Sequence, residues 1–134
     1  MRRQKGQAVV EFALVLPLFF MLFWGIVYTG FMYSDYLTLS NLARESARAA
    51  SIQGSAHYGE VRTAIAEQTL WTNLYTWHGD ENDFRIEDGA NSTVQVTMTA
   101  NLNTEFPGVG IMDFLGLTLP RNYTIVYSMY KEAS

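Results

Sequence analysis

The chain is organised by one stretch, KGQAVVEFALVLPLFFMLFWGIVYTGFM, which covers Lys5–Met32. From Ala8 to Met32 nearly every side chain is apolar, and Glu11 is the one ionisable residue. At a rise of about 1.5 Å per residue these positions form a helix of roughly 37 Å, longer than the ~30 Å hydrocarbon core of a bilayer. We therefore predict a transmembrane helix over residues 7–33, and Glu11 is the residue in it that needs an explanation.

The charges that flank this helix predict its orientation. Arg2, Arg3 and Lys5 precede it, whereas Asp35 is the first charged residue after it and the next cation is Arg44. Because cations close to a span stay in the cytoplasm, we expect a cytoplasmic amino terminus and an extracytoplasmic remainder. An ordinary cleaved signal peptide is the alternative, but its apolar core is only about 7–15 residues long.

Composition limits what the rest of the chain can be. The 134 residues carry a formal net charge of −4 and include no cysteine, so disulfides and thiolate metal sites are excluded. Three cations, Arg2, Arg3 and Lys5, lie in a basic leader, residues 1–6, so the rest of the chain is more acidic than the whole. An acidic domain is a poor partner for a phosphate backbone, and we expect no nucleic-acid binding.

The helix is predicted to continue past the membrane over residues 34–53 and to end near Gly54, a common helix terminator. A stripe of mostly small residues runs along it at helical spacing and favours close packing on another helix or a sheet edge. Within the span, Pro17 should kink the helix, and Gly25 and Gly30 should allow close helix contact. The residues of the stripe are Tyr36, Leu39, Ala43, Ala47 and Ala50.

Residues 54–134 are predicted to form a small α+β globular domain. A second helix is expected at Glu60–Trp77, after which the apolar period changes from about 3.6 to 2. The fold class is therefore α+β, with a long amino-terminal transmembrane helix continuing into a small domain with one further helix and an antiparallel sheet. Strands are expected at Phe84–Glu87, Thr93–Leu102, Leu117–Leu119 and Tyr123–Tyr130, and a short helical turn at Ile111–Leu115.

Groups for catalysis are sparse in this sequence. His57 and His78 are isolated in predicted loops, without a metal-ligand or nucleophile–base pattern around them. The acidic loop Gly79–Asp83 has oxygen ligands suited to calcium, but it lacks the spacing of an EF-hand and is better interpreted as a solvated loop. We expect no catalytic residue, no metal site and no cofactor, and hence no enzyme.

The residues Gly6–Phe12, GQAVVEF, resemble the prepilin peptidase site of the type IV pilin class. The longer run GQAVVEFALVLPLFF is most similar to the TadE-like pseudopilins of the Tad (Flp) pilus system. Ala43–Ala50, ARESARAA, matches a second segment typical of these proteins. The resemblance covers residues 6–51 and is carried by specific motifs.

This resemblance implies a minor pseudopilin that an inner-membrane prepilin peptidase cuts between Gly6 and Gln7. Glu11 would then be the fifth mature residue, which neutralises the new amino terminus of a neighbouring subunit, and Phe12 belongs to the same assembly motif. Gly6 would offer the protease an extended backbone without a side chain. The implied partners are the peptidase, other pilin and pseudopilin subunits, the inner-membrane assembly platform and membrane lipid. The implied roles are pilus assembly, priming or capping, and surface adhesion.

A permanently anchored single-pass envelope protein is the alternative function. Its extracytoplasmic domain would bind a ligand or scaffold a complex, and its leader would never be removed.

Overall fold

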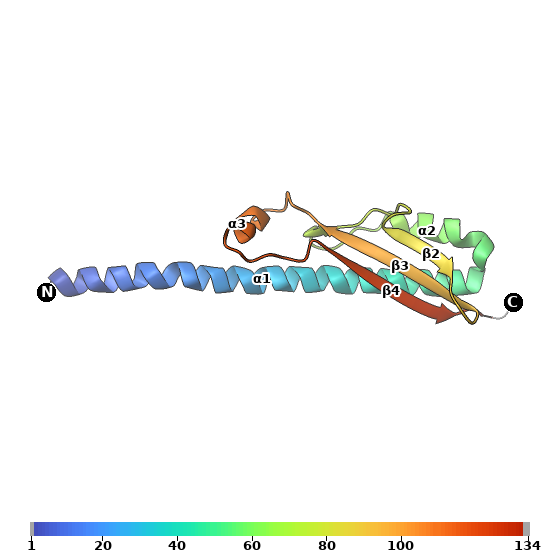
Figure 1. The fold of residues 1–134 in the computed structure, drawn as a ribbon, viewed down its shortest axis with the longest axis horizontal. Helices are drawn as coiled ribbons and strands as arrows, with labels where there is room; N and C mark the ends of the chain where they lie inside the picture. The colour runs from blue at the N-terminus through green and yellow to red at the C-terminus, as the bar shows by residue number, and fades with distance from the viewer. Residues whose placement is uncertain (1, 133–134) are drawn as a thin grey trace. The chain divides into compact units, whose positions relative to one another are not determined.

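A computed structural model describes residues 2–132, with side chains from Gln4 onward (Figure 1). The chain forms two compact units, residues 1–31 and residues 32–134, and helix α1 belongs to both. The predicted α+β class, with a long amino-terminal apolar helix and an antiparallel sheet, is confirmed. The elements are α1 (Arg2–Gln53), the 3-10 helix η1 (Ser55–His57), α2 (Tyr58–Ala66), β1 (Tyr75–Thr76), β2 (Phe84–Asp88), β3 (Thr93–Leu102), α3 (Val109–Phe114) and β4 (Asn122–Tyr130).

Helix α1 ends where the sequence predicts. Its last residue is Gln53, and Gly54 follows with a φ of 80°, a left-handed conformation that favours glycine. The Gly54 amide donates to the Ala50 carbonyl at 3.0 Å, which satisfies one of the last carbonyls of the helix. At the other end α1 begins at Arg2, so the described part of the predicted leader is helical; Met1 and the side chains of Arg2 and Arg3 lie outside the described residues.

The sheet is built on β3, which pairs antiparallel with all three other strands. Strand β4 pairs along most of it, from Thr93↔Tyr130 to Asn101↔Asn122, while β2 pairs with its first half and β1 with its end. The alternation predicted for β3 is confirmed from Thr93 to Ala100, where the apolar residues are buried and the polar residues are not, whereas Leu102 at the end of the strand is half-buried. The buried β3 side chains are Val94, Val96, Met98 and Ala100.

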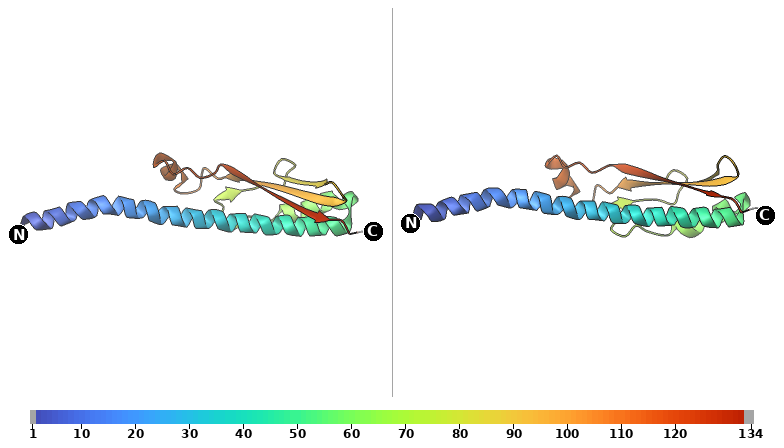
Figure 2. Two further views of the ribbon diagram at one scale, coloured as in Figure 1. Left: turned by 60° about the horizontal axis from the view of Figure 1, so that its bottom comes forward. Right: turned by 90° about the horizontal axis from the view of Figure 1, so that it is seen from below.

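In the second unit, the sheet lies along one side of the 32–53 part of α1 (Figure 2). Three contacts join this part of the helix to β4. The Tyr36 and Tyr123 rings lie 5.8 Å apart, the Arg44 guanidinium lies 5.9 Å from the centre of the Tyr127 ring, and the Ser51 hydroxyl lies 3.7 Å from the Met129 sulfur. The apolar core of the domain therefore forms between one face of the helix and one face of the sheet.

The prediction of a second helix over Glu60–Trp77 is wrong beyond Ala66, where α2 ends. The loop that follows returns so close to this end that a Cβ on Gly79 would collide with Ala66. Residues 70–77 are held in irregular and extended backbone instead, with Leu74 and Tyr75 buried. The helical spacing of their apolar side chains led to the wrong prediction. Trp71, which that prediction placed on the buried apolar face, is in fact 76% exposed.

Two smaller predictions about the carboxy-terminal third are resolved by the structure. The helical turn expected at Ile111–Leu115 is present as α3, shifted toward the amino terminus by two residues at its start. The prediction of a strand at Leu117–Leu119 is wrong, because these residues belong to an irregular connection that leads into β4. A three-residue apolar alternation is too short to require pairing, and β3 is already paired along its length.

Candidate functional site

The predicted processing segment lies inside α1. Gly6 and Gln7 are helical and exposed, and a Cβ placed on Gly6 would meet nothing within 4 Å. In the uncut chain the backbone at Gly6 is helical and not extended. A protease that binds an extended strand must first unwind this turn, and glycine lowers the cost of unwinding by about 1 kcal/mol relative to alanine.

Glu11 lies one turn beyond Gln7 on the same side of the helix. The Gln7 side-chain amide donates to the Glu11 carboxylate at 3.3 Å, and both residues are exposed. Phe12, next to the carboxylate, is 65% exposed. The arrangement presents one negative charge, bordered by apolar side chains, on the outside of an apolar helix.

The other predicted packing positions of the span also face outward. Helix α1 continues through Pro17, whose missing amide leaves the Ala13 carbonyl without its usual helical donor. A Cβ on Gly25 or Gly30 would meet nothing within 4 Å, so no other described part of the chain approaches these glycines closely. These two positions therefore have room for the close helix contact that the sequence predicts.

The alanine stripe, in contrast, is used inside the subunit. Ala43, Ala47 and Ala50 have no exposed surface and belong to the core between α1 and the sheet. Their small side chains allow the helix to approach the sheet closely, but the neighbour is a face of the sheet and not the sheet edge predicted from the sequence. Tyr36 was assigned to the same stripe and is 44% exposed, so the buried face is rotated away from it.

Asp35 is the residue that sequence reasoning missed. It is fully buried in α1, three residues after the apolar stretch, and its carboxylate accepts hydrogen bonds from two residues, Thr72 and Tyr75. The Thr72 amide donates at 2.9 Å, the Thr72 hydroxyl at 2.6 Å and the Tyr75 amide at 3.1 Å. One side chain of α1 thus holds the backbone between α2 and β1, and this explains why that backbone is not helical.

The signal for Asp35 was present in the helical spacing. Asp35 lies four residues before Leu39, and Leu42 and Ser46 continue the buried face at spacings of three and four. A carboxylate on the same stripe as buried leucines requires hydrogen-bond donors, because an unpartnered buried charge is costly. Choosing Tyr36 as the first residue of the stripe placed Asp35 on the wrong face.

Two tyrosines lie close to Asp35. The Tyr75 and Tyr123 rings contact edge to face with their centres 4.8 Å apart, and the Tyr75 hydroxyl donates to the Pro120 carbonyl at 2.7 Å. The buried Tyr123 hydroxyl has no hydrogen-bond partner among the residues described. Burial raises the pKa of both phenols, and the negative charge of Asp35 raises the pKa further.

Replacing tyrosine by phenylalanine should affect the free energy of unfolding differently at these two positions. Tyr123→Phe should leave stability unchanged or raise it, because it removes a buried polar atom that makes no hydrogen bond. Tyr75→Phe should lower the free energy of unfolding by about 1 kcal/mol, because it leaves the Pro120 carbonyl without its donor. Chemical denaturation of the two variants in the same detergent measures the difference; a larger loss for Tyr123→Phe would contradict the assignment.

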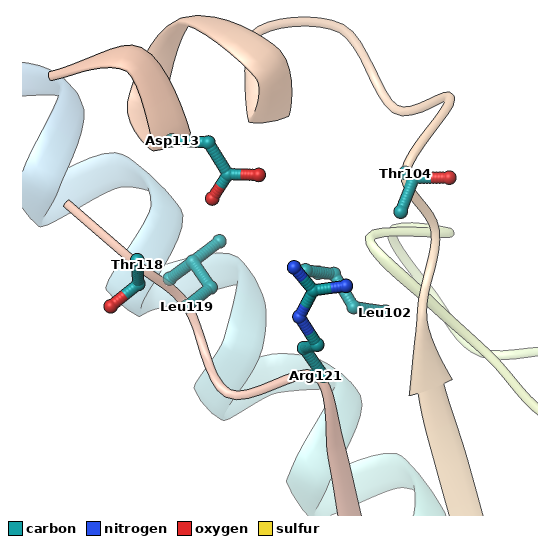
Figure 3. Close-up of a pocket in the computed structure, with 6 residues that line it drawn as sticks. All are labelled: Leu102, Thr104, Asp113, Thr118, Leu119 and Arg121. Carbon is teal, nitrogen blue, oxygen red and sulfur yellow. The ribbon is translucent and has the colours of Figure 1, made fainter. Parts of the chain in front are cut away.

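A small cavity of about 110 Å³ lies at the base of the α3 connection. Figure 3 shows the Asp113 carboxylate and the Arg121 guanidinium pointing into it from opposite sides. Among residues 2–132, no three histidine, aspartate or glutamate side chains gather as metal ligands. The cavity is lined by Leu102, Thr104, Asp113, Thr118, Leu119 and Arg121.

Comparison with known proteins finds a similarity for the amino-terminal segment. Residues 6–48 match the family model described as TadE-like protein, which includes the processing motif, the apolar stretch, Asp35 and most of the alanine stripe. No curated protein and no solved structure gives a significant match to the chain. The predicted resemblance to the TadE-like family is confirmed, and the match ends before the sheet begins.

Proposed function

We propose that this chain, whose residues 6–48 match the TadE-like family model, is a minor pseudopilin of the Tad pilus system. The observation that carries the proposal is Glu11, an exposed carboxylate on an apolar helix, five positions after Gly6. A carboxylate in this setting is unfavourable unless a positive group pairs with it. Cleavage after Gly6 would create such a group, the α-ammonium of Gln7.

The precursor is proposed to reside in a bacterial inner membrane as a single-pass protein. Helix α1 is the one helix of residues 4–132 that is long and apolar enough to cross a bilayer, and the 18-residue window that meets this test has no buried residue. Lys5 and the two arginines of the leader would keep the amino terminus in the cytoplasm. The domain that follows residue 33 would then lie outside, where pili assemble.

Removal of the leader would change both the charge and the partner of the helix. Cleavage by a prepilin peptidase deletes three cations that hold the amino terminus at the cytoplasmic face. The exposed apolar surface of α1 can then leave the lipid for a bundle formed with other pilin and pseudopilin subunits at the inner-membrane assembly platform. In that bundle Glu11 of one subunit would pair with the Gln7 ammonium of the next and fix their register. The subunit would prime or cap a pilus used for surface adhesion.

Processing is tested with two matched glycine variants, Gly6→Ala and Gly25→Ala. Both glycines are helical and neither added Cβ meets anything within 4 Å, so the two variants differ in position and not in packing. We expect Gly6→Ala to slow removal of residues 1–6, because its side chain enters the protease subsite and stabilises the helix that must unwind by about 1 kcal/mol. Gly25→Ala should be processed like the wild type.

Intact-mass measurement of the protein, co-expressed with a prepilin peptidase, reports the loss of the leader directly. Equal processing of Gly6→Ala and the wild type would contradict cleavage at this position. A wild-type chain that keeps residues 1–6 in the presence of an active peptidase would instead support the permanent membrane anchor.

A further inference from the structure

The domain exposes four large apolar side chains at one of its ends. Trp71 precedes β1 and is 76% exposed, and Ile111, Phe114 and Leu115, in or next to α3, are 67%, 89% and 47% exposed. We call these four residues the apolar end surface. Side chains of this size and exposure usually mark a contact with a partner or a membrane.

Hydrogen bonds place the apolar end surface at the end of the domain where α1 enters it. Asp35 binds Thr72, so Trp71 lies beside the first turn of the domain's part of α1. The Asn103 amide donates to the Leu74 carbonyl at 2.9 Å, and the Leu102 amide donates to the Arg121 carbonyl at 2.7 Å. The connection that carries α3 therefore starts and ends at the same level, and Figure 1 shows it extending beyond the end of β3.

The α3 connection is built with its apolar side chains outward. Val109 and Met112 are buried and anchor the helix, while Ile111 and Phe114 point away from that anchor. The Asp113 carboxylate points into the cavity at the base of the connection, as the Arg121 guanidinium does (Figure 3). The exposed apolar surface of α3 therefore consists of Ile111 and Phe114, and the Asp113 carboxylate is exposed beside them.

The position of Asp35 indicates what covers this surface. Asp35 comes three residues after the apolar stretch, a rise of about 4.5 Å along the helix, so its level is that of the boundary between hydrocarbon and headgroups. Tryptophan and tyrosine are enriched at this boundary, and Tyr33, 61% exposed on α1, has the same environment. We propose that the apolar end surface inserts into the outer lipid interface of the membrane that α1 spans.

This proposal depends on membrane insertion of α1 and not on leader cleavage or pilus assembly. The uncut precursor should already hold its domain against the lipid. We expect an apolar contact and not attraction to anionic headgroups, because the α3 connection has one cation, Arg121, and two acidic residues, Glu105 and Asp113. High salt should therefore leave the contact intact, since salt screens charge pairs and not apolar burial.

The absence of native cysteine allows a direct test in the full-length precursor. Phe114→Cys and Trp71→Cys, each carrying a nitroxide, are compared with Asn91→Cys in the exposed β2–β3 turn at the other end of the sheet. Since the side chains of Phe114 and Trp71 are largely exposed, these substitutions remove little packing. The protein is reconstituted at one copy per nanodisc of phosphatidylethanolamine and phosphatidylglycerol.

The ratio of collision with oxygen to collision with a water-soluble nickel chelate reports depth in the bilayer. We expect this ratio to be several-fold higher at positions 114 and 71 than at position 91, in low and in high salt. Equal ratios at the three positions would overturn the proposal. So would protection of position 114 that occurs only with two copies per disc, which would assign the surface to a second subunit, or protection that high salt abolishes.

Discussion

An Asp35→Ala variant is expected to lose the folded domain or most of its stability. The substitution removes one carboxylate that accepts three hydrogen bonds and leaves the amides of Thr72 and Tyr75 buried without an acceptor. Each orphaned buried donor costs about 1–3 kcal/mol, so we expect a loss of roughly 2–6 kcal/mol from a domain of ordinary marginal stability. Denaturation of the full chain in detergent, followed by near-ultraviolet circular dichroism, measures this loss.

Two further variants separate the contributions to this site. Thr72→Val removes the hydroxyl that donates to Asp35 and accepts from the Leu74 amide at 3.3 Å, and it should cost about 1–2 kcal/mol. Asp35→Asn keeps one acceptor oxygen and should fall between Thr72→Val and Asp35→Ala. If Asp35→Ala unfolds like the wild type, and if the Thr72 and Tyr75 amides exchange hydrogen no faster in it, then Asp35 does not hold the loop.

The site around Asp35 also shows where prediction from sequence ends. Strand β3 and the end of α1 were predicted correctly because their signals are local: ten alternating residues in one case, Gly54 in the other. Residues 67–77 were predicted wrongly because their conformation depends on a carboxylate about 40 positions earlier in the chain. Local periodicity contains no information about such a partner until the buried face of α1 is assigned correctly.

The arrangement of the processing and register residues, in contrast, could be predicted from the sequence. Gly6, Gln7 and Glu11 lie within two turns of one helix, so their mutual spacing in the sequence already determines their arrangement in the structure. The structure adds that the segment is helical before cleavage and that Gln7 bonds to Glu11. What Ala43, Ala47 and Ala50 pack against could be decided only from the fold, because a stripe of small residues fits a sheet and a second helix equally well.

Glu11→Ala is expected to abolish assembly while leaving leader removal intact. Glu11 lies after the cut and makes its hydrogen bond with Gln7 on the exposed helix surface, so its loss should not affect access to Gly6. In the assembled bundle, however, the Gln7 ammonium would lack its partner among apolar side chains. Leaving one buried charge unpaired costs about 3–5 kcal/mol, which corresponds to at least a hundredfold less incorporation of the subunit.

Glu11→Gln tests whether charge is the property that matters. The amide keeps the size of the side chain and can still bond to Gln7, but it cannot neutralise an ammonium, so we expect this variant to assemble as poorly as Glu11→Ala. Val15→Ala is the matched control, because Val15 lies one turn further along α1 and is 59% exposed. Surface pili sheared from cells that express each variant alone are quantified, and processing is confirmed by intact mass. Wild-type piliation by Glu11→Gln would show that assembly needs a polar group at this position and not its charge, and the pairing of Glu11 with the neighbouring amino terminus would then be wrong.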